Sequence, residues 1–524
     1  MKNKSFQSRG LCLGVACHKL VYAKNQHRNG VIMKYIQIHP NDNVAVMLDD
    51  IAQGDKVSVE GGEVISNEPI MRGHKIALRD IAEGDPVIKY GNVIAVATKN
   101  VKAGDWVHTH NVRTNLSESD TYTYEHVESK LPEIQERTFQ GYLRQDGRAA
   151  IRNELWIIPT VGCVNSVAGE LAKQNQHLVT GSIEGLYSFP HPFGCSQLGG
   201  DHEQTKKLLT ALVRHPNAGG VLVLGLGCEN LTMSQFQEEL GSWDPARVKF
   251  LVCQNVEDEL EEGGRLLAEL AEYAGSFQRE EISASKLVIG MKCGGSDGLS
   301  GITANPTVGR FSDYMVSIGG STVLTEVPEM FGAESILFNR CQSREVFDKA
   351  VSMVNDFKTY FVEHGQVVYE NPSPGNKAGG ITTLEDKSCG CVQKGGHAQI
   401  VDVLRYAEPV TKRGLNLLSG PGNDLVSATN LTAAGAHMIL FTTGRGTPFG
   451  APAPTVKIST NTALAEKKSG WIDFNAGTVA EGEPLNDAGL RLLDYVLSVA
   501  SGERTQTEKK GYREISIFKD GVVL

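Results

Sequence analysis

Residues 287–306 read LVIGMKCGGSDGLSGITANP, and this stretch holds the two features on which the fold depends. Its first residues form a short continuous apolar run, which is typical of a strand buried on both faces of a parallel sheet. A loop with paired glycines, a cysteine and an acid follows the run. Helical spacing at 202–214 and 257–274 predicts α/β domains with largely parallel sheets. Similar apolar runs occur at 155–161, 221–225, 249–253, 321–327 and 438–441.

The sequence before these runs is different. From residue 33 to residue 107, brief β-like runs alternate with Gly, Asp and Asn turns, and DIAQGDKV, DIAEGD and NVKAGDWV repeat one Gly-Asp turn. This pattern predicts a small β-clip or barrel domain. Residues 108–137 are polar and aperiodic, which indicates a linker. We expect two α/β domains at 138–285 and 286–524, the second of which carries most active-site loops.

The first 32 residues follow neither pattern. A short apolar patch lies between basic residues, but it is too short for the core of a signal peptide. We therefore expect residues 1–32 to be a disordered extension or an upstream mis-start, with Met33 opening the first strand.

Composition narrows the class of protein. A chain of 524 residues exceeds what one core usually holds, so several domains are expected. The net charge of −10 and the lack of long Lys/Arg runs argue against a nucleic-acid partner. The apolar runs are all shorter than the roughly 20 residues that a membrane helix needs. Ten cysteines in so long a chain are not a disulfide framework. We expect a cytoplasmic protein that binds neither nucleic acid nor membrane.

Polar residues follow most of the predicted strands. In open parallel sheets, ligands bind at the carboxyl ends of the strands. We therefore expect the loops after the strands to meet on one rim and to form the active site. The loops concerned are 162–165, 226–230, 292–297 and 442–446.

Two of these loops carry the clearest candidates. Cys293 and Asp297 are potential metal ligands or acid/base groups, and the glycines between them let backbone N–H groups approach an anion. The alternative is a plain strand-to-helix turn capped by Ser296 or Asp297. Arg445 lies between two glycines and can present its guanidinium to a carboxylate; the alternative is an exposed arginine on a surface turn.

Other candidates are more dispersed. Glu326 and Glu329 suit a divalent cation or acid/base work, or else simply begin a helix. The N-terminal domain offers His39, His74 and the pair His108/His110, although histidines on strands are often structural. Several cysteines lie beside glycines and raise an iron–sulfur cluster as an alternative, but their spacings match no compact cluster motif. These cysteines are Cys163, Cys195, Cys228 and Cys293.

Taken together, the motifs resemble the altronate/galactarate dehydratase family from Met33 to Leu524. They include HPNDNVAV, RGHKIAL, RNELWIIPTVGCVN, GCSQLGGDH, VLGLGCEN, CGGSDGLSGITANP, TEVPEMFGAE, ENPSPGNKAGGITTLEDKS and TTGRGTPFG. The resemblance implies an N-terminal SAF-type β-clip domain, a large α/β catalytic part and activation by Fe²⁺ or Mn²⁺. Within the family, VHTHNVRTNL and TVGCVN are similar to the altronate branch. The implied reaction removes water from D-altronate to give 2-dehydro-3-deoxy-D-gluconate.

The rim and the family motifs together suggest roles for single residues. We expect proton transfer by Lys75, Glu229 or His74. We expect the metal among His39, His74, Asp297 and Glu329, and the substrate at Ser296, Asn305, Lys377, Thr443 and Arg445.

Three alternatives stay open at this point. In the first, the chain is a dehydratase whose substrate is galactarate or another sugar acid or a sulfonated hydroxy acid. In the second, it is an iron–sulfur hydro-lyase. In the third, it binds or senses a sugar acid without catalysis. In each case the partner is a small sugar acid, and a homo-oligomer is possible.

Overall fold

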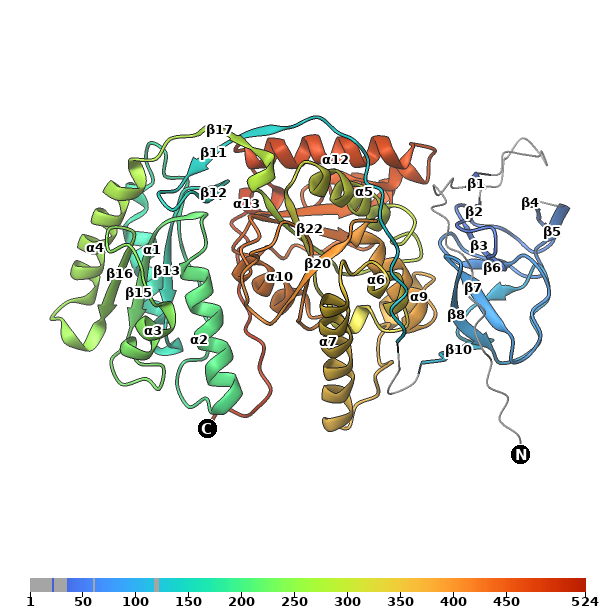
Figure 1. Cartoon of the computed structure of the whole chain (residues 1–524), viewed down its shortest axis with the longest axis horizontal. Helices are drawn as coiled ribbons and strands as arrows, with labels where there is room; N and C mark the ends of the chain where they lie inside the picture. The colour runs from blue at the N-terminus through green and yellow to red at the C-terminus, as the bar shows by residue number, and fades with distance from the viewer. Residues whose placement is uncertain (1–20, 23–34, 60–61, 117–121) are drawn as a thin grey trace. The chain divides into compact units, whose positions relative to one another are not determined.

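The computed structural model describes residues 21–22, 35–59, 62–116 and 122–524, and the chain divides into two compact units, Met1–Arg113 and Thr114–Leu524 (Figure 1). Strand-rich sequence at the N-terminus and parallel sheets beyond it confirm the predicted fold class. The expected extension at residues 1–32 lies outside the described residues, except that Val21–Tyr22 forms β1. Among the described residues, no helix is long and apolar enough to cross a membrane.

The N-terminal unit consists of short antiparallel strands. One sheet has the order β1, β2 (Tyr35–Gln37), β3 (Val44–Met47), β6 (Lys75–Ala77), β9 (Trp106–Val107). A second has the order β10 (Val112–Arg113), β8 (Asn92–Ala97), β7 (Pro86–Lys89), and β4 (Lys56–Val59) pairs with β5 (Gly62–Ile65). The repeated turn depends on Gly54, Gly84 and Gly104, which all have the positive φ that glycine tolerates best.

The second unit opens with a four-stranded parallel sheet. Its order is β14 (Gly185–Ser188), β13 (Glu154–Pro159), β15 (Ala218–Gly225), β16 (Val248–Val252). The helices that pack on it are α1 (Asn165–Gln174), α2 (Gly199–Val213), α3 (Met233–Leu240) and α4 (Glu259–Gly275).

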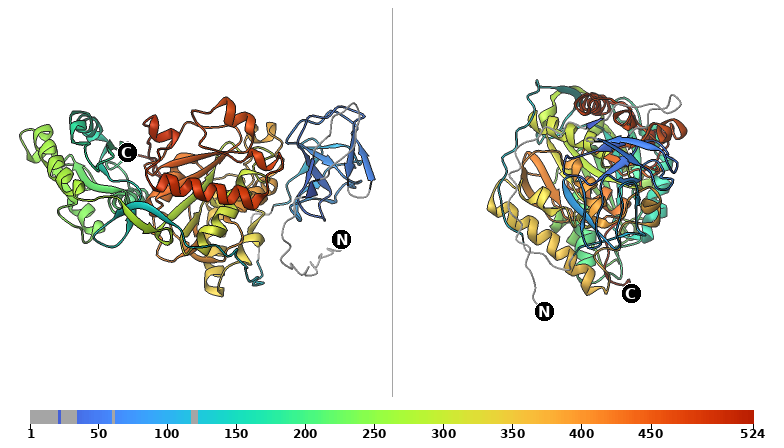
Figure 2. Two further views of the ribbon diagram at one scale, coloured as in Figure 1. Left: turned by 90° about the horizontal axis from the view of Figure 1, so that it is seen from above. Right: turned by 90° about the vertical axis from the view of Figure 1, so that its right-hand side faces the viewer.

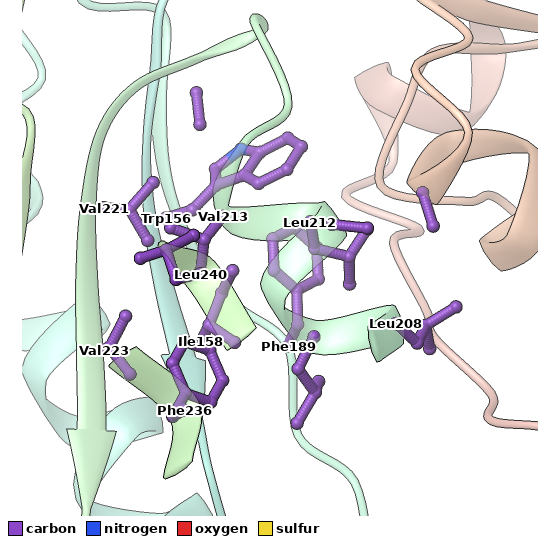
Figure 3. Packing of buried hydrophobic residues seen from close by; sticks show 14 of the residues in the cluster. Trp156, Ile158, Phe189, Leu208, Leu212, Val213, Val221, Val223, Phe236 and Leu240 are labelled. Carbon is purple, nitrogen blue, oxygen red and sulfur yellow. The ribbon is translucent and has the colours of Figure 1, made fainter. Parts of the chain in front are cut away.

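Apolar side chains cover both faces of this sheet. On one face, Trp156 and Ile158 pack with Leu212 of α2 and Phe236 of α3 (Figure 3). On the other face, Leu155 and Ile157 join the cluster that includes side chains of α1 and α4. Because successive strand residues point to opposite faces, a strand covered on both sides must be apolar throughout. This is why the run 155–161 was recognisable in the sequence.

A seven-stranded parallel sheet forms the core of the rest of the unit. Its order is β20 (Ile400–Leu404), β21 (Gly414–Leu418), β19 (Ser321–Leu324), β18 (Val288–Cys293), β22 (Met438–Thr443), β23 (Thr455–Ser459), β24 (Phe474–Asn475). All neighbouring pairs are parallel.

Helices cover both faces of the seven-stranded sheet. Thr322 bonds by its hydroxyl to Ser312 of α5 (Ala304–Ser317) at 2.8 Å, whereas Val323 packs with Leu431 of α10 (Asp424–Ala433). Adjacent strand residues face opposite ways, so α5 and α10 lie on opposite faces. The long helix α12 (Leu485–Ala500) packs along α5 and is red in Figures 1 and 2. The remaining helices are α6 (Glu334–Phe338), α7 (Arg344–Glu363), α8 (Pro374–Ala378), α9 (Leu384–Cys391), α11 (Thr462–Lys467) and α13 (Gln506–Lys509).

Two features join the sheets of this unit. A small antiparallel sheet has the order β12 (Ala149–Ala150), β11 (Thr138–Leu143), β17 (Glu280–Ser283). Beside it, a buried ion-pair network links the start of β13 to the last residues of the chain. Arg152 pairs with Glu508 at 2.7 Å, and Arg513 pairs with Glu154 at 2.7 Å and with Glu508 at 3.3 Å. Arg152 is therefore a structural residue at the junction of the two sheets.

Candidate active site and metal centre

The carboxyl edge of the seven-stranded sheet collects polar side chains from several strands. β18 ends at Cys293, the loop after β19 carries Glu326 and Glu329, and Asp424 follows β21. Because neighbouring strands are parallel, their ends share one edge of the sheet. The segment 384–396, which contains α9, adds a cysteine and two lysines to the same place.

Three donors converge at the centre of this edge. The thiols of Cys293 and Cys391 lie 3.4 Å apart, and each donates to Glu329 Oε2 at 3.1 Å. These donor atoms all lie within 4.8 Å of one another, and all three side chains are buried. Two sulfurs and a carboxylate at this spacing form a possible metal-binding group.

Lysine ammonium groups surround the three donors. Lys394 Nζ lies 3.0 Å from Cys293 Sγ and 3.3 Å from Glu326, and Lys387 Nζ donates to Glu329 at 2.7 Å. Burying an ion is costly unless it is paired, so each lysine needs these partners. A third lysine, Lys292, contacts Glu326 at 3.1 Å and Asp424 at 2.7 Å.

The lysines also set the charge of the carboxylates. Burial alone would raise the pKa of Glu329, but Lys387 and Lys394 outweigh it and hold this pKa at about 2. Glu329 is therefore ionised at neutral pH. For Glu326, burial prevails over Lys292 and raises the pKa. The hydrogen bond with Cys293, and then burial, raise the pKa of the Cys391 thiol.

The loop after β18 also carries Asp297, whose hydrogen bonds are structural. The Asp297 carboxylate accepts from Ser300 Oγ at 3.0 Å, Leu299 N at 3.1 Å and Thr460 Oγ1 at 2.9 Å. Burial raises its pKa. A Cβ at Gly444 would lie 2.4 Å from Asp297 Cγ, so only glycine lets the two loops meet. Asp297 thus ties strand ends together, and it does not belong to the group of three donors around Cys293.

The residues expected to bind substrate lie around this edge, with different exposure. Asn305 is fully buried; its amide donates to Gly390 O at 2.9 Å and accepts from Thr442 at 2.6 Å. Ser296 and Thr443 are buried, and the Thr443 hydroxyl accepts from Gly446 N at 2.8 Å. Arg445 is exposed beside Gly295. Lys377 lies on α8 and is partly buried.

Glu229 belongs to the other parallel sheet. Its carboxylate accepts from Thr160 Oγ1 at 2.8 Å, Gly227 N at 2.5 Å and Leu226 N at 3.1 Å. Burial would raise its pKa, but these hydrogen bonds outweigh burial and lower it. The loops 162–165 and 226–230 follow strands of the four-stranded sheet, and 292–297 and 442–446 follow strands of the seven-stranded one. The single rim predicted from the sequence is therefore wrong, because two separate sheets each have their own carboxyl edge.

The histidine candidates lie in the N-terminal unit. His74 is buried, and its Nδ1 accepts from Trp106 Nε1 at 3.2 Å, which assigns the ring proton to Nε2. Its ring centroid lies 5.2 Å from that of His108. Lys75 is fully buried on β6. His39 lies in a turn, where its Nδ1 accepts from Asn41 N at 3.1 Å.

Sequence reasoning missed Cys391, Lys387 and Lys394. Their segment, LEDKSCGCVQKGG, forms a helix and the turn after it, so the rule of polar loops after strands does not apply to it. A signal was nevertheless present, because residues three and four apart share one face of a helix. Lys387 lies four residues before Cys391 and Lys394 three residues after it.

Comparison with known proteins identifies the family of the chain. Three family models match: "Altronate/galactarate dehydratase SAF domain" at 33–115, "D-galactarate dehydratase/Altronate hydrolase, second domain" at 141–275, and "D-galactarate/Altronate dehydratase, C-terminal" at 284–523. Altronate dehydratase of Escherichia coli is 53% identical, over 94% of this chain and 100% of its own length. The Bacillus subtilis altronate dehydratase is also 53% identical, over 94% and 99%. Galactarate dehydratase (L-threo-forming) of Escherichia coli is 33% identical over 93% and 97%. The chain belongs to the altronate/galactarate dehydratase family.

Proposed function

We propose that this protein is a hydro-lyase that removes water from D-altronate and forms 2-dehydro-3-deoxy-D-gluconate. Two relatives named altronate dehydratase are 53% identical over nearly their whole length, whereas the galactarate dehydratase is 33% identical. The observation that carries the chemistry is the buried group Cys293, Glu329 and Cys391 at the carboxyl edge of a parallel sheet. Galactarate is the second candidate substrate.

The donor set fits a divalent transition metal. Thiolates suit borderline ions such as Fe²⁺, whereas Mn²⁺ prefers carboxylate and water ligands, so we favour Fe²⁺. Charge supports the same assignment. Three lysines balance three carboxylates around the thiols, so a dication is neutralised if both thiols release their protons on binding. The lysines are Lys292, Lys387 and Lys394, and the carboxylates are Glu326, Glu329 and Asp424.

The overall reaction takes a proton from C2 of the sugar acid and hydroxide from C3. The enol that remains becomes the 2-keto acid by tautomerisation. A bound divalent ion would supply Lewis acidity, which stabilises negative charge on the substrate carboxylate as the C2 proton leaves. Lys387 and Lys394 keep Glu329 ionised and in position. Arg445, on the exposed loop after β22, is our candidate for binding the substrate carboxylate.

Proton transfer needs a base for C2 and an acid for the leaving hydroxyl. His74 and Lys75 remain our candidates, because an imidazole and an amine can both transfer protons and both side chains are buried. His39 and Asp297 remain weaker candidates for metal ligands. Glu229 is better suited to holding its loop, because its oxygens already accept three hydrogen bonds.

The test uses protein purified without oxygen and stripped of metal by a chelator. D-altronate is added with Fe²⁺, Mn²⁺ or no metal, galactarate is run in parallel, and the product is identified by NMR. We expect turnover of altronate that depends on metal. Cys293→Ser and Cys391→Ser should each lose at least about 100-fold in turnover. Cys341→Ser, a matched change at another buried cysteine, should retain it. Equal turnover without metal would show that the reaction does not need a metal. If folded, metal-loaded protein does not turn over altronate, the proposed reaction is refuted.

A further inference from the structure

A second group of cysteines lies at the carboxyl edge of the four-stranded sheet. The dipeptide Gly-Cys occurs four times: 390–391 ends in Cys391 of the buried group, and the other three, 162–163, 194–195 and 227–228, lie at this edge. The three pairs follow β13, β14 and β15, which are neighbours in the sheet and parallel. None of these residues belongs to the buried group around Cys293. We call Cys163, Cys195 and Cys228 the cysteine rim.

Hydrogen bonds lock the three loops to one another. Gly162 N donates to Phe193 O at 2.9 Å, and Leu231 N donates to Gly194 O at 3.0 Å. Each bond joins the loop of one cysteine to the loop of another. The loop that carries Cys195 therefore contacts both of the others.

The glycines are what allow this close approach. Gly194 has φ of 99°, and a Cβ there would lie 1.9 Å from the carbonyl oxygen of Thr160. Gly227 has φ of 129°, and its Cβ would lie 2.6 Å from Gln254 Oε1. At Gly162 a Cβ would lie 3.0 Å from His191 O. A side chain would thus be strained at Gly194 and Gly227 and tightly confined at Gly162.

The thiols of the rim are accessible and hold polar partners. Cys163 and Cys228 are exposed, Cys195 is half-buried, and all three are free. Cys195 Sγ donates to Asn230 Oδ1 at 3.3 Å, and Gln254 Nε2 donates to Cys228 Sγ at 3.5 Å. Cys195 also borders the apolar cluster on one face of the sheet, whereas the Cys163 and Cys228 thiols are open to solvent. Hydrogen bonds to sulfur are a feature of iron–sulfur sites.

The spacing of the thiols distinguishes a cluster from a single ion. Among the described residues, only the group around Cys293 places three donors within 4.8 Å of one another, so at least two of the rim thiols are farther apart than this. An ion held at about 2.3 Å from each sulfur requires sulfurs closer than about 4.6 Å. Neighbouring strands lie about 4.8 Å apart, so thiols on three strand ends suit a larger group. We infer that Cys163, Cys195 and Cys228 bind a [4Fe–4S] cluster.

A fourth cysteine on this sheet does not join the rim. Cys253 follows β16, the edge strand of the sheet, and it comes directly after Val252, whereas a glycine precedes each cysteine of the rim. The cluster therefore has three cysteine ligands, and its fourth iron keeps a position for water or another oxygen ligand.

The test is anaerobic reconstitution of the full chain with Fe²⁺ and sulfide. We expect about four iron and four acid-labile sulfide per chain, a brown colour and an EPR signal on reduction. Cys163→Ser, Cys195→Ser and Cys228→Ser should each lose most of the sulfide, with circular dichroism showing that they remain folded. Cys253→Ser, on the same edge, should retain it. A folded wild-type chain that takes up no sulfide, or one metal ion without sulfide, would overturn the inference.

This result is separable from the proposed reaction. Cys293→Ser should lose turnover of altronate but keep the cluster, because it lies on the other sheet. If the protein binds the cluster but turns over no sugar acid, the inference that the cysteine rim binds a cluster is supported and the proposed dehydration of altronate is refuted. If all three rim variants keep their full sulfide content, these cysteines do not hold the cluster, and this conclusion does not depend on the enzymatic activity.

Discussion

Three buried histidines share one pattern of hydrogen bonds. In His191, His215 and His437, Nε2 lies 2.8 to 3.1 Å from a carbonyl oxygen and Nδ1 accepts from a backbone N–H. The neutral ring satisfies both partners, whereas a proton on Nδ1 would oppose the N–H. Burial lowers the pKa of each, for His437 to about 4.

This pattern predicts sensitivity to acid. The pKa of His437 in the folded state, about 4, lies below its ordinary value of 6.5, so the unfolded chain binds more protons between these values. The free energy of unfolding should therefore fall as pH drops from 6.5 to 4, by up to about 1.4 kcal/mol per pH unit for this residue. Urea denaturation at several pH values measures the slope, which His437→Gln should reduce. The same slope in His437→Gln and wild type would contradict the assignment; exposed His110→Gln serves as the control.

At the scale of elements, the metal centre depends on how closely α5 packs. Gly309 lies in α5, and a Cβ there would be 2.1 Å from the carbonyl oxygen of Gln393, the residue before Lys394. Any side chain at this position must push the segment 392–395 away from α5. The position of Lys394 beside Cys293 thus depends on a glycine in another element.

We expect Gly309→Ala to weaken the site. The added methyl group should destabilise the fold by about 1 to 3 kcal/mol and lower the affinity for Fe²⁺. Gly169→Ala is the matched control, because this helical glycine of α1 has nothing within 4 Å of a Cβ. That control should be neutral or stabilising by up to about 1 kcal/mol. Metal titration and thermal unfolding of both variants make the comparison; equal affinities would show that η6 (Val392–Gly395) moves without affecting the donors.

The elements also show what the sequence can reveal. Strands covered on both faces, such as β13, β15 and β22, were visible as continuous apolar runs. β20, β21 and β14 were missed because Asp402, Asn416 and the short segment GLYS interrupt the apolar pattern. Glu329 was found because it follows a strand. Its partner Cys391 was not, because 98 residues separate it from Cys293 and only the fold brings the two together.

At the scale of the whole molecule, the His74→Ala substitution tests whether the N-terminal unit takes part in catalysis. If His74 carries a proton or binds metal, His74→Ala should lose at least about 100-fold in turnover. Stopped-time assays of altronate conversion measure this, with His110→Ala as the control from the same group of rings. Wild-type turnover in His74→Ala would exclude this histidine from the chemistry.

The buried ion pairs between Arg152, Glu154, Glu508 and Arg513 have a consequence for dissecting the protein. The segment 141–275 matches a family model of its own, yet two of its charged residues find their partners in the last twenty residues of the chain. A recombinant fragment cut at the edges of that match would expose Arg152 and Glu154 without their counter-ions. We therefore expect a fragment of this region to fold stably only when residues 505–524, which contain both partners, are supplied with it.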